Sequence, residues 1–288
     1  MATKRIVGFS GGIDSQACCR WLLERFGPDD LIILNSDAGG NEDPLTTAHV
    51  EWYSKNVHPV IMLSPIVADM AGRATGKIAE LGLKPTDPLT FDLLALLKQR
   101  FPARKSQFCT EHLKLRPALR WQLEAFGVGG IYEGKDFERY TGVRRDESEK
   151  RKNVADREWD SFYDCYLNRP LAAWTKKHCF DLCLAFGEQL NPLYKLGFNR
   201  VGCAPCVNSN KDDILAWVQR NPAMIEKIRI WEQKVGRTYF APMVPGLRIN
   251  WIDDVVQWSL TSWGGRQTNL LRVLNDRPNC ESKYGICE

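Results

Sequence analysis

The N-terminal part of the chain alternates short apolar runs with longer amphipathic segments. Apolar residues dominate 5–8, 31–34 and 59–63, and they recur at helical spacing over 16–26 and 45–56. These two periods predict strands and helices in alternation. Strands that alternate with helices form parallel sheets with right-handed crossovers, so we expect an α/β fold around a parallel sheet of about five strands.

The pattern continues less regularly after residue 66. Glycine and proline interrupt residues 67–102, which form either a mobile flap or a long connection. Further helices are predicted over 89–100, 118–126 and 170–186. A fourth core strand is predicted over 130–134, where Ile131 and Tyr132 are flanked by glycines.

The last third of the chain is helical in pattern and rich in tryptophan. We expect these side chains to pack in a core rather than to stack on bases. They are Trp217, Trp231, Trp251, Trp258 and Trp263. The sequence therefore predicts a sheet domain over 1–207 and a mostly helical C-terminal part over 208–288.

Composition narrows the class of protein. Of the 288 residues 44% are apolar, which suffices for a buried core, and the net charge of +4 permits an anionic substrate without requiring a nucleic acid. No signal peptide or membrane span is evident, so we expect a cytoplasmic protein that makes no membrane contact.

Ten cysteines need an explanation in a reducing compartment, where a disulfide framework is not expected. Four lie in helical, largely apolar patterns and are interpreted as core residues: Cys18, Cys19, Cys179 and Cys183. The role of Cys165 is left open. Five others stand beside turns or charges and are candidates for metal ligation: Cys109, Cys203, Cys206, Cys280 and Cys287.

The segment Phe9-Ser10-Gly11-Gly12-Ile13-Asp14-Ser15 links the first predicted strand to the first predicted helix. Such a turn directs backbone N–H groups at an anion, and its glycines let a phosphate approach the main chain. Ser10 and Ser15 add hydroxyl donors, and Asp14 either orients the turn or faces a cation. The plain alternative is a connecting turn. The lysine of a Walker A motif is absent.

Two further groups are expected near this loop. Asn35 and Asp37 follow the next strand, so they could meet adenine or ribose, although Asp37 is equally consistent with an ordinary turn. Arg144 and Arg145 follow a glycine turn, and paired guanidinium groups suit phosphate or sulfate. The alternative for the arginines is a surface salt-bridge pair. The charged run 144–157 is otherwise interpreted as a solvated face.

Several motifs occur in a characteristic order along the chain. They are the SGGxDS loop, Cys109 followed by Lys114 and Pro117, GVRRDES at 142–148, PLAAWT at 170–175, NPLY at 191–194 and GCAPC at 202–206. As a set they resemble the phosphoadenosine phosphosulfate reductase family, particularly its iron–sulfur members. The loop resembles the PP-loop of the adenine-nucleotide alpha-hydrolase-like superfamily, whose sheet is Rossmann-like.

The resemblance implies functional residues. Cys109, Cys203 and Cys206 would hold a [4Fe–4S] cluster near the nucleotide, and Arg144 and Arg145 would face the substrate anion. The nucleotide contacts would be Phe9, Ser10, Gly11, Gly12, Asp14, Ser15, Asn35, Asp37 and Gly134.

Two departures from the reductases affect the expected reaction. Phe108 replaces the first of a tandem cysteine pair, and the C-terminal Glu-Cys-Gly-x-His string is absent. The intact loop looks like that of members that cleave ATP to AMP and pyrophosphate. We therefore expect, with Mg²⁺, adenylation of an acceptor and sulfur transfer to it, with Asp14, Arg144, Arg145 and Cys287 as catalytic residues.

The alternatives are an adenylylsulfate or phosphoadenylylsulfate reductase that forms sulfite, and a nucleotide-binding subunit with a structural cluster. A cysteine desulfurase or thioredoxin would supply sulfur or electrons, and the acceptor could be tRNA, DNA or a small molecule. Cys280 is the expected fourth cluster ligand and Cys287 the expected sulfur carrier, although the two could be exchanged. Alternatively, the fourth iron atom of the cluster has no protein ligand and binds sulfur directly.

Overall fold

The computed structural model describes residues 3–70, 72, 74–133, 137–198 and 200–262. A six-stranded sheet runs through its centre in the order β3-β2-β1-β4-β6-β5, and only β5 is antiparallel to its neighbour. The strands are β1 Lys4–Gly8, β2 Leu31–Ser36, β3 Val60–Leu63, β4 Phe137–Tyr140, β5 Arg157–Asp160 and β6 Cys165–Asn168. The predicted α/β class is confirmed. No helix within these ranges is long and apolar enough to cross a bilayer.

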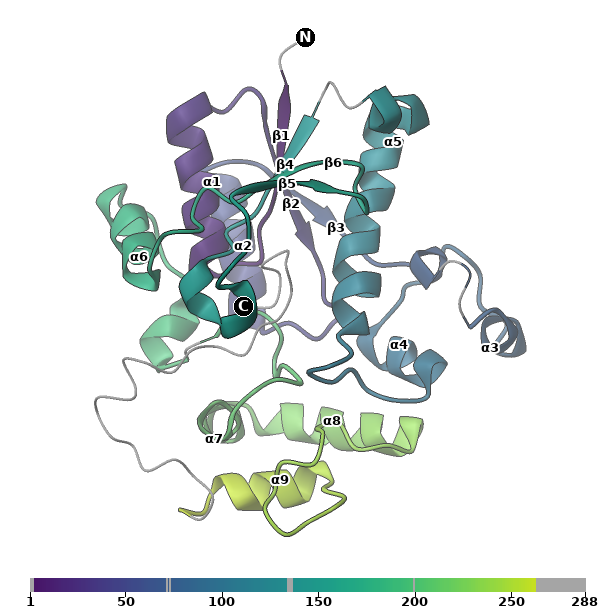
Figure 1. Cartoon of the computed structure of the whole chain (residues 1–288). Coiled ribbons are helices and arrows are strands. Elements are labelled where there is room, and N and C mark those ends of the chain that lie inside the picture. The colour runs from purple at the N-terminus through teal and green to yellow at the C-terminus, as the bar shows by residue number, and fades with distance from the viewer. Residues whose placement is uncertain (1–2, 71, 73, 134–136, 199, 263–288) are drawn as a thin grey trace.

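Helices cover both faces of the sheet (Figure 1). On one face lie α1 Ile13–Phe26, α2 Pro44–Asn56 and α6 Lys176–Ala185, and on the other lies α5 Arg116–Glu133. The first face buries the four cysteines predicted to be core residues, each 0% exposed. Cys165 is also buried, at 1% exposure, on the α5 side.

The predicted strand over 130–134 is wrong. Residues up to Glu133 belong to α5, which bends at Gly127 with a φ of 71°, and the fourth core strand is β4. The charged residues Glu138 and Arg139 interrupt the apolar pattern by which that strand could have been predicted from the sequence. Arg139 is nevertheless only 6% exposed, since its guanidinium lies 3.7 Å from the ring centroid of Tyr163.

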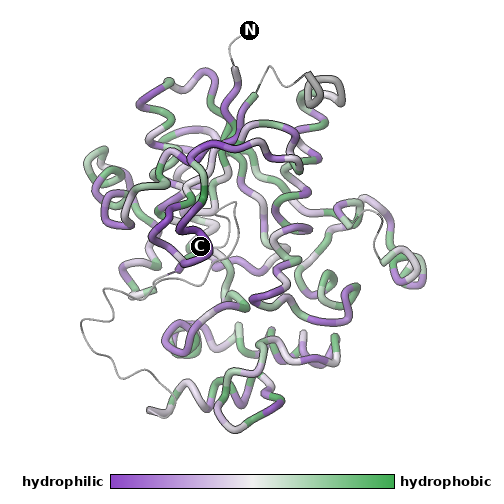
Figure 2. Tube along the Cα trace, viewed as in Figure 1, coloured by the Kyte–Doolittle hydropathy of each residue, from purple (hydrophilic) through white to green (hydrophobic). Residues whose placement is uncertain are grey.

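The hairpin of β5 and β6 was not expected from the sequence. Figure 2 shows this hairpin largely in hydrophilic colours, which explains why it carries no strand pattern. Most of the charged run 144–157 is at least partly exposed, as predicted, but three of its members are buried. They are Arg144, Glu147 and Arg151, each at most 2% exposed.

The C-terminal helices lie beyond the carboxyl ends of the strands (Figure 1). These helices are α7 Lys211–Arg220, α8 Pro222–Val235 and α9 Ile252–Ser259, and they share a core with α4 Phe91–Lys98. Trp217, Trp231 and Trp258 are buried in that core as predicted, but Trp251 is 43% exposed, so its predicted core role is wrong. Trp263 lies outside the described residues.

The segment 67–102 contains short elements besides α4. They are a 3₁₀ turn, Val67–Met70, and the helix α3 Thr75–Glu80, which projects to one side of the molecule (Figure 1). The predicted helix over 170–186 begins later than expected, since Thr175 caps α6 by accepting a hydrogen bond from the N–H of His178.

Candidate functional site

The glycine loop lies at the centre of the sheet, between β1 and α1. Because β2 flanks β1 on one side and β4 on the other, the chain leaves β1 at the crevice where α/β proteins bind ligands. The Ser15 hydroxyl donates to the carbonyl of Gly12 at 2.8 Å and lies 3.1 Å from the Ser10 hydroxyl. Gly11 has a φ of 78°, which favours glycine. The loop is thus held in shape by hydrogen bonds between its own residues.

The NPLY segment, far away in the sequence, holds the loop from outside. The Ile13 N–H donates to the Tyr194 hydroxyl at 2.9 Å, and the Asn191 amide donates to the carbonyl of Gly11 at 3.1 Å. Asn191 is 0% exposed. Sequence reasoning gave these two residues no role of their own, although the motif was noted.

Asp14 forms a buried ion pair with Arg144. Their carboxylate and guanidinium are 2.8 Å apart, and both side chains are 3% exposed. Gly142 packs so closely on the loop that a methyl group there would overlap the carbonyl oxygen of Asp14. Burial opposes the charge of Arg144, but Asp14 and Asp146 outweigh it and raise the pKa of Arg144.

The two candidate arginines face different partners. Arg145 donates to the carbonyl of Val154 at 3.0 Å and pairs with Asp156, and its side chain is 33% exposed. Only Arg144 is turned toward the loop, so the structure does not bring the two guanidinium groups to one position.

Asn35 and Asp37 lie at the end of β2, beside the loop. The Asn35 amide donates to the carbonyl of Phe9 at 2.7 Å, and this residue is 1% exposed. Asp37 accepts a hydrogen bond from the Gly40 N–H at 3.1 Å, as turn aspartates do. Both side chains therefore shape the strand ends.

A first pocket extends from the loop toward α5. It is lined by Gly8, Phe9, Ser10, Leu34, Ser36, Lys114, Ala118, Arg139 and Tyr163. Two of these side chains, Lys114 and Arg139, are cationic and at most 7% exposed. Such a lining suits an anionic ligand beside the loop.

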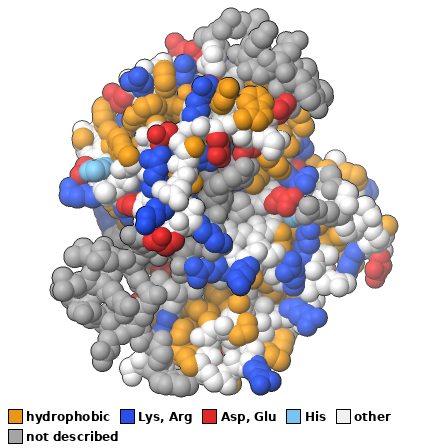
Figure 3. All heavy atoms as spheres, in the orientation of Figure 1, with side chains coloured by type: hydrophobic (Ala, Val, Ile, Leu, Met, Phe, Trp, Pro, Cys, Tyr) orange, Lys and Arg blue, Asp and Glu red, His pale blue; other side chains and the backbone are white. Residues whose placement is uncertain are grey.

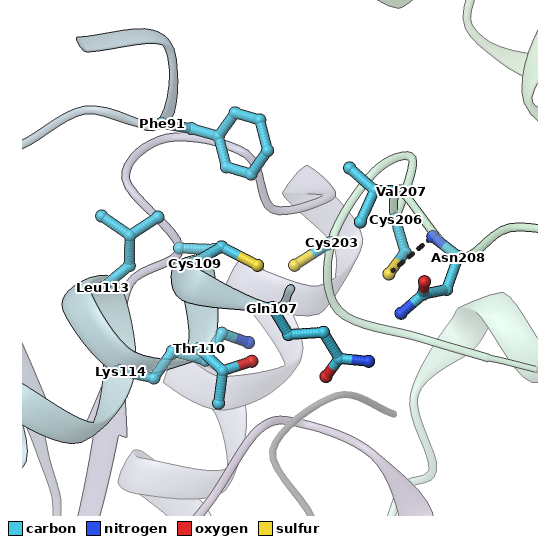
Figure 4. A pocket seen from close by; sticks show the side chains of 11 residues that line it. Phe91, Gln107, Cys109, Thr110, Leu113, Lys114, Cys203, Cys206, Val207 and Asn208 are labelled. Atoms are coloured by element: carbon cyan, nitrogen blue, oxygen red, sulfur yellow. Dashed lines mark hydrogen bonds between the residues drawn. The ribbon is translucent and has the colours of Figure 1, made fainter. Parts of the chain in front are cut away.

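A second pocket gathers three of the predicted metal ligands. Cys109, Cys203 and Cys206 line it, and Figure 4 shows their sulfur atoms turned toward the same space. We call it the three-cysteine pocket. Cys109 immediately precedes a π-helical turn, Thr110–Leu115, a form that is frequent at functional sites.

The loop of Cys203 is fixed by the chain after β2. Cys203 forms a β-bridge with Glu42, and two backbone hydrogen bonds flank the bridge. The Ala204 N–H donates to the backbone carbonyl of Asn41 at 2.8 Å, and the Asp43 N–H donates to the backbone carbonyl of Gly202 at 3.1 Å.

Burial governs the chemistry of the thiols. The pKa of Cys109 is raised to about 12 and that of Cys203 to about 11, mainly by burial and in part by the neighbouring thiols. The charge of Lys114 opposes both shifts. The Asn208 N–H donates a hydrogen bond to the sulfur of Cys206 at 3.5 Å.

Lys114 joins the two pockets, because it lines both. Its ammonium lies 3.9 Å from the carboxylate of Glu42, and both side chains are 8% exposed. Burial raises the pKa of Glu42 to about 7, although Lys114 opposes that shift. Lys114 was noted in the sequence only as part of a motif, since nothing in the spacing shows that it is buried.

The donor set fits part of an iron–sulfur centre. Three converging thiols provide the soft ligands that such clusters use, and the Asn208 N–H supports one of them. Among the described residues, no three His, Cys, Asp or Glu side chains group closely enough for a single metal ion. Cys280, Cys287 and Gly134 lie outside the described residues.

Parts of this chain are similar to known proteins. Residues 97–209 match the phosphoadenosine phosphosulfate reductase domain. The whole chain is 28% identical to an uncharacterised 37.8 kDa protein of Escherichia phage 186, over 97% of that protein. An adenosine 5'-phosphosulfate reductase of Allochromatium vinosum is 30% identical over 36% of this chain and 40% of its own length.

A solved phosphoadenylyl-sulfate reductase of Candida auris, in complex with phosphate, superposes with a TM-score of 0.46 and 13% identity. That superposition covers 70% of this chain and 82% of the other. The similarity to phosphoadenosine phosphosulfate reductases thus covers residues 97–209 through the family's domain, and 36% of the chain through the Allochromatium vinosum enzyme.

Proposed function

We propose that this protein is a PP-loop enzyme that binds ATP, adenylates an oxygen of an acceptor and replaces that oxygen with sulfur. One observation carries the proposal: Lys114 lines both the pocket at the glycine loop and the three-cysteine pocket. An activated acceptor bound at the loop would therefore lie next to sulfur.

Different residues of the chain would bind the phosphates, stabilise charge and position the loop. Backbone N–H groups at the start of α1 would bind the phosphates, and Lys114 and Arg139 would stabilise charge in the first pocket. Arg144 would position Asp14 and the loop rather than contact the substrate directly. Mg²⁺ bound to ATP would neutralise the departing pyrophosphate. A sulfur nucleophile at the hydrosulfide level would then displace AMP from the acceptor.

The three-cysteine pocket would hold a [4Fe–4S] cluster through Cys109, Cys203 and Cys206, with a fourth ligand from Cys280. When bound, such a cluster supplies electrons or an iron site for sulfur. Cys287 would carry sulfur. A cysteine desulfurase would deliver sulfur, or thioredoxin would deliver reducing equivalents, in the cytoplasm. The sheet domain would comprise residues 1–207 and the helical C-terminal part residues 208–288.

Reduction of an adenylyl sulfate is the second candidate, and the similarity to the Allochromatium vinosum reductase favours it. Two assays separate the candidates. Release of AMP and pyrophosphate from ATP supports adenylation, whereas formation of sulfite from adenylyl sulfate and thioredoxin supports reduction.

Ser10→Ala should weaken ATP binding by a factor of about 2–12, the effect of losing one neutral hydrogen bond of about 0.5–1.5 kcal/mol. The Ser10 hydroxyl lies against Ser15 and the Gly12 N–H, so its loss loosens the loop. Isothermal titration with ATP measures the change. Ser259→Ala is the control, because Ser259 is a buried serine of α9. Equal affinities in both variants would contradict the role of the loop.

Protein purified without oxygen should be brown and contain one [4Fe–4S] cluster, and Cys206→Ser should lose most of the iron. Cys183→Ser, which changes a cysteine of the sheet core, should keep it. Iron analysis and Mössbauer spectra measure both variants, and the spectra of Cys280→Ser and Cys287→Ala identify the fourth ligand. Zinc in place of iron would refute the cluster.

A further inference from the structure

Four basic residues follow one another closely between the end of α4 and the π-helical turn. They are Lys98, Arg100, Arg104 and Lys105. No acidic residue lies between Asp92 and Glu111. The carboxylate of Asp92 lies 2.5 Å from the ammonium of Lys234, and that of Glu111 lies 2.9 Å from the guanidinium of Arg116. Both acids at the ends of the stretch thus have cations from outside it, and the stretch keeps a net positive charge.

A tight turn presents two of these cations at its tip. The N–H of Ala103 donates to the carbonyl of Ser106 at 3.2 Å, and the N–H of Ser106 donates to the carbonyl of Ala103 at 2.8 Å. The two residues between them, Arg104 and Lys105, are exposed. Backbone contacts therefore fix the place from which these two side chains project. We call residues 98–106 the cationic turn.

Phe108 supports the other two cations. Its ring centroid lies 5.8 Å from the ammonium of Lys98 and 5.4 Å from the guanidinium of Arg100, within the range of cation–π attraction. Arg100 also donates to the Ser106 hydroxyl at 2.9 Å. Phe108 is the residue that replaces the first of the tandem cysteines of the reductases. At this position the chain thus has a ring that orients two positive charges.

Gln107 joins the cationic turn to the candidate site. Its amide donates to the carbonyl of Arg104 at 3.4 Å, and it lines the three-cysteine pocket. In Figure 1 the chain after α4 passes between the sheet and the C-terminal helices, and Figure 3 shows Lys and Arg side chains gathered across that part of the same face. A polymer bound to the turn would therefore lie close to the site.

The chemistry of this surface favours a nucleic acid over a protein as the partner. Among the described residues, no large hydrophobic side chain is exposed between Leu81 and Trp159. Protein interfaces have an apolar or aromatic core, and single-stranded nucleic acids stack their bases on exposed aromatic rings. The turn offers cations without either feature, which suits the regular phosphates of a duplex.

We propose that the cationic turn binds the phosphodiester backbone of a duplex nucleic acid. Each phosphate that a Lys or Arg side chain neutralises releases counterions, so this binding is independent of base sequence and weakens as salt is added. The duplex would be the acceptor that is adenylated and thiolated. Only this role as acceptor rests on the proposed function, whereas the binding does not.

Fluorescence anisotropy without ATP tests the binding, with a short DNA duplex and an RNA duplex of the same sequence as probes. Arg104→Gln/Lys105→Gln should raise the dissociation constant about tenfold or more, because two charge-assisted contacts are lost. The plot of log affinity against log salt concentration should also become less steep, by up to about 1.8 for two phosphate contacts. The duplex that binds more tightly identifies the polymer as DNA or RNA.

Arg25→Gln/Lys55→Gln is the matched control. It also removes one exposed arginine and one exposed lysine, but these belong to the last turns of α1 and α2, at the amino ends of the strands. Its affinity and salt dependence should equal those of the wild type. Equal salt dependence in the two double variants would overturn the proposal. Binding of thioredoxin in place of either duplex would do the same.

Two further measurements separate this proposal from the proposed function. Arg104 and Lys105 line neither pocket and are exposed, so their double variant should keep the ATP affinity and the urea midpoint of the wild type. Failure of the wild type to release pyrophosphate from ATP would refute the proposed function alone, because the duplex titration contains no ATP.

Discussion

Arg144→Ala should lower the free energy of unfolding by about 3–5 kcal/mol, the usual effect of removing one partner of a buried ion pair. The carboxylate of Asp14 is 3% exposed and would lose the guanidinium that lies 2.8 Å from it. Because Asp14 lies within the glycine loop, ATP binding should fall as well. Urea unfolding measures the stability, and titration with ATP measures the binding.

Arg145→Ala is the control for this prediction. Its ion pair with Asp156 joins side chains that are 33% and 74% exposed, so its loss should cost no more than about 1 kcal/mol. In the double variant Asp14→Asn/Arg144→Ala, removal of both charges should restore part of the stability. Similar small losses in Arg144→Ala and Arg145→Ala would show that the buried pair is not important.

Gly142→Ala should destabilise the protein by at least about 3 kcal/mol, the upper range for overpacking, and weaken ATP binding more than tenfold. The added methyl group would overlap the carbonyl of Asp14 and lie 3.0 Å from the backbone nitrogen of Ser15. Backbone atoms cannot rotate away as a flexible side chain can. The loop would therefore have to move, and thermal unfolding together with ATP titration detects this.

Gly76→Ala provides the comparison, because nothing lies within 4 Å of the position of its new methyl group. Gly76 belongs to α3, where alanine favours the helix by about 1 kcal/mol. This variant should be as stable as the wild type or more so. If Gly142→Ala behaves in the same way, the close approach does not constrain the loop.

The parts of the fold that the sequence predicts well depend on local patterns. The first strand, the glycine loop and α1 follow from apolar spacing and from two adjacent glycines. The strand β4 could not be predicted, because Arg139 is accommodated by Tyr163 and by Gln122, whose side chain accepts its hydrogen bond at 3.0 Å. Those compensating contacts come from other elements and leave no local pattern.

The candidate site likewise contains residues that the sequence predicts and residues that only the structure reveals. Cys109, Cys203 and Cys206 were predicted through a family resemblance, and the structure places them around one pocket. Lys114 was not predicted as a site residue, since it is an ordinary cation in the sequence. Its importance comes from burial, which only the folded chain provides.

The bridge between Glu42 and Cys203 has a consequence for how the protein matures. Arg220 reinforces that junction by binding both carboxylate oxygens of Asp43, a residue 177 positions earlier in the chain. Contacts over such separations form late, after local helices and neighbouring strands. The loop that carries Cys203 and Cys206 is therefore fixed against the chain after β2 only when this junction, to which α7 contributes Arg220, has closed.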